Sequence, residues 1–120
     1  MHATRAYTAV AKETANPRDL EWQLLLKAAY KMQSVHDGWA DKPTGLNEAL
    51  LYNRRLWTVF LDSVCSKESA LPVPLRENIA NLGVFVMSQT FALMTDPKPS
   101  QLVPLININR ELAAGLRGDG

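Results

Sequence analysis

The sequence predicts an all-α fold: a single-domain bundle of four to five helices. Apolar residues recur at spacings of three and four along most of the chain, which is the period of a helix that buries one face. No run alternates strictly between apolar and polar residues, as a half-buried strand would. Clusters of proline and glycine divide the chain into segments of helical length. Since 120 residues suit one core, we expect residues 1–120 to form one domain.

Residues 1–15 are predicted to form a first helix that docks loosely. Its apolar positions are mostly small, so its inner face buries little area; they are Ala3, Ala6, Tyr7, Val10, Ala11 and Thr14. Asn16 suits a helix N-cap, Pro17 suits the first helical position, and Asp19 stands where a capping box has its acidic residue. A second helix should therefore begin at Pro17.

The second and third helices are each predicted from their apolar residues and from the loop between them. The second, from Pro17 to about His36, has only a narrow polar strip, so we expect it to be central with neighbours on two sides. Asp37-Gly38 is the predicted end of this helix. The third runs from about Leu46 to Ser66, and its predicted core stripe is Leu46, Leu50, Asn53, Trp57, Phe60, Leu61 and Val64.

The fourth helix opens at Pro74 and ends before Asp96-Pro97. Residues 78–95 contain no charged side chain, but their polar residues are too many for a lipid-facing helix, so we expect a helix buried in protein. Its predicted core stripe is Ile79, Leu82, Val86, Thr90 and Leu93.

Ser100 is the predicted N-cap of the fifth helix, with Pro104 tolerated in the first turn. Its predicted core stripe is Leu102, Leu105, Ile106, Asn109, Leu112, Ala113 and Leu116.

Composition excludes several classes of function. The net charge of +1 supplies no electrostatic footprint for nucleic acid. Two histidines and one cysteine cannot build a structural zinc site, and no nucleotide-binding loop or catalytic constellation is present, so we expect no metal, no cofactor and no enzymatic activity. Cys65 is expected to be a small buried or half-buried residue. The lone cysteine and an N-terminus without a signal peptide favour the cytoplasm.

Arg54-Arg55 is the only adjacent basic pair in the chain. With Tyr52 and Trp57 close by, it could contact RNA through charge and stacking. The interpretation we favour is structural, since these arginines can pair with acidic neighbours on the same helix, such as Glu48 and Asp62.

Asn53 and Asn109 interrupt otherwise apolar stripes, and a buried amide without a partner costs about 1 to 3 kcal/mol. Two interpretations remain open. The favoured one is an internal polar network that fixes helix register. The other is a groove in which both amides meet a bound helix.

Four segments of the sequence resemble the FlaF family of flagellar biosynthesis regulators from alphaproteobacteria. They occur in the expected order from about Tyr7 to Arg117: NPRDLE (16–21), ALLYNRRLWTVFL (49–61), LRENIANLGVFVMSQT (75–90) and LININRELAAGL (105–116).

This resemblance implies a cytoplasmic, non-enzymatic protein that acts after transcription on flagellin production. It points to a flagellin-binding export chaperone that covers a terminal helix of flagellin and couples flagellin synthesis to secretion. The alternative is an RNA-associated regulator of flagellin mRNA translation or stability, acting with a second regulator, FlbT. The sign of regulation differs within the family.

The matched segments also supply the candidate partner-binding residues. Of these, Arg55 is expected to face outward and is a better contact candidate than Trp57, which is expected in the core. The full set is Tyr52, Asn53, Arg54, Arg55, Asn78, Asn81, Asn107, Asn109 and Arg110. A further hypothesis is that residues 1–15 shield the binding groove, so that deleting them would raise the association rate with flagellin.

Overall fold

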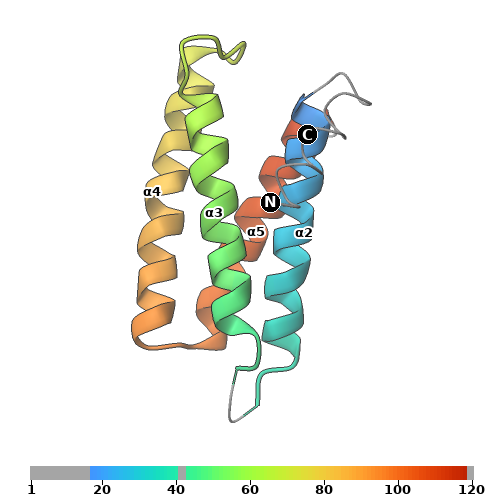
Figure 1. The fold of residues 1–120 in the computed structure, drawn as a ribbon, viewed down its shortest axis with the longest axis vertical. Coiled ribbons are helices and arrows are strands. Elements are labelled where there is room, and N and C mark those ends of the chain that lie inside the picture. The colour runs from blue at the N-terminus through green and yellow to red at the C-terminus, as the bar shows by residue number, and fades with distance from the viewer. Residues whose placement is uncertain (1–16, 41–42, 119–120) are drawn as a thin grey trace.

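Four α-helices form the described part of the chain, residues 17–40 and 43–118, in the computed structural model (Figure 1). They are α2 (Pro17–Asp37), α3 (Leu46–Val64), α4 (Val73–Thr95) and α5 (Leu102–Arg117), with a 3-10 turn, η1 (Pro99–Gln101), before the last. No strand occurs in these two ranges, and the predicted all-α bundle is confirmed. The predicted first helix, the Asn16 cap and the shielding segment lie outside the described residues.

Glycines mark the turn between α2 and α3. The backbone N–H of Gly38 donates to the carbonyl of Ser34 at 3.0 Å and closes α2 where the sequence predicts. Gly45 has a φ of 81°, a left-handed conformation that side chains disfavour, and its carbonyl accepts the N–H of Ala49 at 3.0 Å. This turn sets α3 beside α2.

The end of α3 corrects one expectation. The helix stops at Val64, two positions before the predicted Ser66, and the N–H of Cys65 caps it on the carbonyl of Leu61 at 2.9 Å. Cys65 is exposed, not buried or half-buried. It follows the buried Val64 by one position, so its side chain points about 100° away from the core.

The start of α5 corrects the expectation about its N-cap. Ser100 lies inside η1 and makes no capping hydrogen bond, so the prediction of a Ser100 N-cap is wrong. The 3-10 turn leads directly into α5, because the N–H of Leu102 bonds the carbonyl of Pro99. Pro104 lies in the first turn of α5, as predicted.

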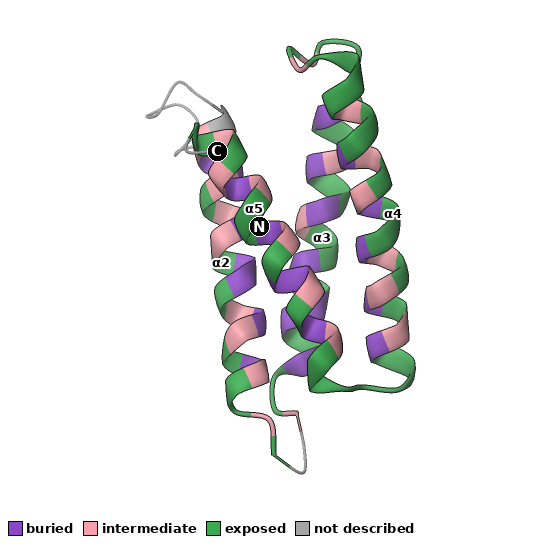
Figure 2. Ribbon diagram, turned by 180° about the vertical axis from the view of Figure 1, so that it is seen from behind, coloured by how far each residue is buried: buried purple, intermediate pink, exposed green. Residues whose placement is uncertain are grey.

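The core lies where α2, α3 and α5 meet. α2 packs most extensively against α5 and also against α3, which confirms its neighbours on two sides. Figure 2 shows the buried residues facing inward along these helices. Most of the predicted core stripe of α3 is buried, and Leu61 is half-buried; the buried members are Leu46, Leu50, Asn53, Trp57, Phe60 and Val64.

α4 packs mainly on α3 and lies along the outer edge of the bundle (Figures 1 and 2). The two helices approach closely at Gly83, where an added Cβ would lie only 2.6 Å from Leu61 Cδ1. The prediction that residues 78–95 are buried in protein is wrong for this chain alone. One face of α4 is buried as predicted, but large apolar side chains on its other faces are exposed, among them Val84, Phe85, Phe91 and Met94.

Candidate functional site

Asn109 is the centre of a buried hydrogen-bond network that joins three helices. Its Nδ2 donates to Asn53 Oδ1 of α3 at 2.7 Å and to the carbonyl oxygen of Leu25 of α2 at 3.3 Å. Its Oδ1 accepts the indole N–H of Trp57 at 3.0 Å. All three of these hydrogen bonds of the Asn109 side chain are buried in the core.

Asn53 and Asn109 are both fully buried. This is the arrangement that the register-network interpretation describes, and in it neither amide reaches the surface. Asn53 Nδ2 has no acceptor among the described residues, so Asn109 is the better satisfied of the two. The pair positions helices and does not contact solvent.

Tyr52 lies between α2 and α3 and is half-buried. The ammonium groups of Lys27 and Lys31 stand 5.8 and 5.0 Å from the centre of its ring, within the range of a cation–π contact. Burial raises the pKa of the Tyr52 phenol above its ordinary value. Tyr52 therefore helps to dock α2 on α3.

Arg54 and Arg55 are exposed on α3. Within the described residues neither forms an ion pair, and Glu48 instead lies 3.9 Å from Lys31. The expected pairing with Glu48 or Asp62 is therefore absent from this part of the structure. Both guanidinium groups are open to a partner.

The four remaining candidate residues are exposed but do not converge. Asn78 and Asn81 lie on α4, whereas Asn107 lies on α5. Arg110, also on α5, donates from Nη2 to Gln33 Oε1 of α2 at 3.3 Å. The nine sequence candidates thus divide between the core and several separate faces.

Sequence reasoning missed an apolar stripe on α4. Five residues at spacings of 4, 3, 4 and 3 fall on one side of the helix, about 100° from its buried face. We call them the α4 seam: Ala80, Val84, Met87, Phe91 and Met94. Val84 and Phe91 are each 71% exposed and Met94 is 56% exposed. The spacing was readable in the sequence, but the exposure was not.

A hollow of about 280 Å³ adjoins the C-terminal end of the α4 seam, between α3 and α4. Its lining is mostly apolar, with one cationic side chain, and consists of Asn47, Leu50, Leu51, Arg54, Thr90 and Met94. Leu51 is itself exposed. The seam and the hollow together form one surface, apolar along its length and positively charged at one edge.

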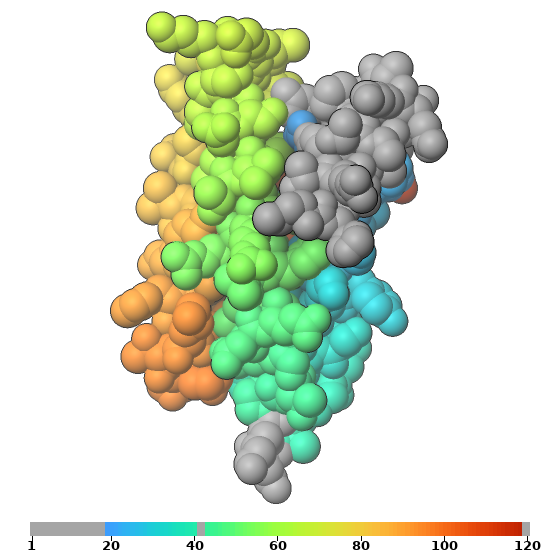
Figure 3. Space-filling model, viewed as in Figure 1, coloured from blue at the N-terminus to red at the C-terminus, as the bar shows by residue number. Residues whose placement is uncertain are grey.

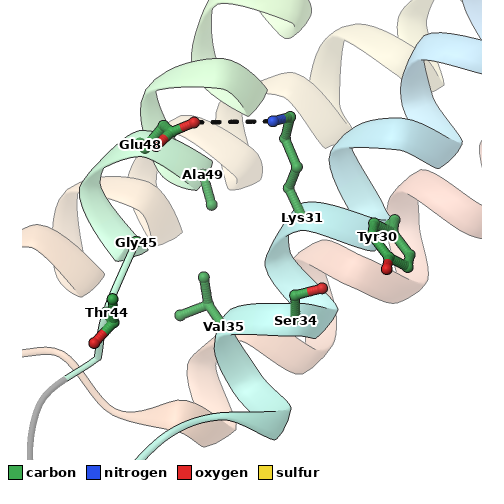
Figure 4. Close-up of a pocket in the computed structure, with 8 residues that line it drawn as sticks. All are labelled: Tyr30, Lys31, Ser34, Val35, Thr44, Gly45, Glu48 and Ala49. Atoms are coloured by element: carbon green, nitrogen blue, oxygen red, sulfur yellow. Dashed lines mark ion pairs between the residues drawn. The ribbon is translucent and has the colours of Figure 1, made fainter.

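A second hollow, of about 260 Å³, lies between α2 and the start of α3 (Figure 4). Lys31 and Glu48 span it at 3.9 Å, while Val35 and Ala49 supply apolar lining. No three potential metal ligands gather anywhere in the described residues. The α4 seam, by contrast, exposes several large apolar side chains on one helix, namely Val84, Phe91 and Met94.

A family model described as flagellar protein FlaF matches residues 3–116. The chain belongs to the FlaF family. No curated protein matches it, and no solved structure does. For this FlaF-family chain the match implies a flagellum-related protein, and the predicted resemblance is confirmed. In the described part of the chain no helix is long and apolar enough to cross a membrane.

Proposed function

We propose that this FlaF-family protein is a cytoplasmic, non-enzymatic chaperone that binds flagellin before export. Its partner segment is an amphipathic terminal helix of unassembled flagellin. One observation carries the proposal: in a chain of a flagellar family, the α4 seam presents large apolar side chains to solvent, with Val84 and Phe91 each 71% exposed. An exposed apolar stripe of this length is typical of a protein–protein contact.

The geometry suits a helical partner. The seam and the adjoining hollow offer apolar side chains at helical spacing, which is how one helix recognises the apolar face of another. A flagellin terminus that is disordered before assembly loses conformational entropy on binding, and burial of apolar area offsets that loss. Binding would also cover the apolar face through which flagellin subunits polymerise.

Charge gives the complex an orientation. Residues 78–95 carry no charge, whereas Arg54 stands at the edge of the hollow beside Met94. An acidic residue of the flagellin helix would meet Arg54 there. Because the seam itself is uncharged, salt should weaken the complex only slightly.

The alternative is regulation of the flagellin transcript, acting with FlbT. Direct RNA binding requires basic side chains gathered on one surface. Here Arg54 lies beside α4, whereas Arg110 is bonded to Gln33 of α2, so these two arginines do not share one surface. The geometry therefore favours the flagellin complex.

Calorimetric titration tests the proposal. The full chain is titrated with monomeric flagellin from the same organism at low and high salt, and in parallel with the leader of the flagellin transcript. We expect a salt-tolerant complex of one chain with one flagellin and a negative heat-capacity change. Binding to the transcript alone, weakening steeply with salt, would overturn the proposal in favour of the alternative.

A further inference from the structure

The α4 seam is also self-complementary. We propose that, when no other partner is bound, a second copy of this chain covers it, with the two α4 helices antiparallel. The pairing would regulate access to the α4 seam, the surface that we propose for flagellin. Only this regulatory consequence rests on the proposed function. The pairing itself follows from side-chain size and spacing along α4.

Spacing is the first argument. The seam residues recur at 4, 3, 4 and 3, which is the pattern that lets two helices keep one face together along their length. In the described structure α3 covers a different face of α4, which lies along one side of the molecule (Figure 3). Val84, Phe91 and Met94 of the seam are exposed, whereas Met87 at its centre is partly buried against the core. The stripe therefore has the pattern of a helix pair without the second helix.

Side-chain size selects the orientation. In an antiparallel pair centred on Met87, Ala80 faces Met94 and Val84 faces Phe91, so each layer combines a smaller with a larger side chain. A parallel pair would set Ala80 against Ala80 and Phe91 against Phe91. It would leave a gap at one layer and overfill another, and both are destabilising.

Charge does not oppose this pairing. No residue from 78 to 95 is charged, so like charges do not face one another along the seam. Beyond the seam, Arg76 stands next to Glu77 at one end of α4, and at the other end Lys98 Nζ lies 3.6 Å from Asp96 Oδ2. Both ends therefore carry both signs of charge, and the orientation is selected by side-chain size.

The consequence is competition for one surface. A chain that pairs through the seam cannot bind a flagellin helix there, so the concentration of the chain sets the fraction that is open. Newly made flagellin would then draw the pair apart. Apparent flagellin affinity should fall as the total concentration of the chain rises.

Sedimentation equilibrium of the full chain alone tests the pairing without flagellin. We expect a monomer–dimer equilibrium in the wild type. Phe91→Glu places a charge in the seam and should weaken the dimer by about a hundredfold. Tyr30→Glu is the matched control, because Tyr30 on α2 is 72% exposed and lies off the seam; it should dimerise as the wild type does. A wild type that stays monomeric, or a Phe91→Glu variant that dimerises normally, would overturn the inference.

Disulfide trapping tests the orientation. In a Cys65→Ser background, Ala80→Cys and Met94→Cys chains are mixed and oxidised. Antiparallel pairing predicts the mixed 80–94 disulfide and self-linking of a Met87→Cys chain. Ala80→Cys chains that link to themselves would show parallel pairing and contradict the proposed orientation. Since no flagellin is present, failure of the dimer and failure of the chaperone function are separate results.

Discussion

Asn109 Nδ2 donates a 2.7 Å hydrogen bond to Asn53 Oδ1 inside the core, across 56 positions of sequence. The same amide reaches the carbonyl of Leu25 and accepts from Trp57. One side chain thus holds α2, α3 and α5 in register. This network positions α3, the helix on which α4 mainly packs.

Asn109→Leu should be the most damaging change in the network. It leaves Trp57 Nε1, the Leu25 carbonyl and Asn53 Oδ1 buried without the partner they have now. We expect the free energy of unfolding to fall by about 2 to 4 kcal/mol. Urea denaturation followed by circular dichroism measures it.

Asn53→Leu is the comparison for that variant. It removes a single acceptor and also eliminates the buried Nδ2 group that has no acceptor in the described structure. We expect a smaller loss, about 1 kcal/mol. Equal losses for the two variants would mean that Asn109 is not the centre of the network. Lost flagellin affinity with unchanged stability would instead support the groove interpretation of these two amides.

Gly83→Ala tests the contact between α3 and α4. A Cβ at this position would lie 2.6 Å from Leu61 Cδ1 and 3.2 Å from its Cγ, so the Leu61 side chain must move. We expect a net loss of about 1 kcal/mol despite the higher helix propensity of alanine. Gly115→Ala is the control, because nothing lies within 4 Å of its added Cβ. Its free energy of unfolding, measured by thermal or urea denaturation, should rise by about 0.5 to 1 kcal/mol. A stabilised Gly83→Ala would contradict the close packing.

Tyr52 gives the bundle a dependence on alkaline pH. Burial raises the pKa of its phenol above the ordinary 10.0, so the unfolded chain releases this proton at a lower pH than the folded chain does. The contribution to stability is complete below pH 10 and is lost as pH rises through the folded pKa. Tyr52→Phe should flatten the decline in stability above pH 10, whereas the exposed Tyr30→Phe should not. Unfolding curves across that pH range, with tyrosinate absorbance, check both.

Much of the fold could be predicted because the helical spacing of apolar residues agrees with the positions of prolines and glycines at helix ends. Gly38 and Pro74 mark helix ends, and the apolar stripe around Trp57 marks the core side of α3. Asn53 and Asn109 indicated a polar network because a buried amide on an apolar stripe needs a hydrogen-bond partner. Their pairing with each other required the three-dimensional structure.

The surface of α4 could not be predicted in the same way. Residues 78–95 are uncharged, and an uncharged helix indicates burial without saying which molecule covers it. Phe91 and Ile79 are equally apolar in sequence, yet Phe91 is exposed and Ile79 is buried against the bundle. The seam also spans only about two heptads, fewer than a coiled coil needs to be recognised from sequence.

The most direct test of the chaperone account is the affinity of monomeric flagellin for Phe91→Glu and Tyr30→Glu chains. Both substitutions add one negative charge at a side chain that is more than two-thirds exposed, so both variants should fold. Calorimetry at chain concentrations below those that give dimers should show a loss of about a hundredfold in affinity for Phe91→Glu and wild-type affinity for Tyr30→Glu. Wild-type affinity in the Phe91→Glu chain would contradict the claim that the α4 seam binds flagellin.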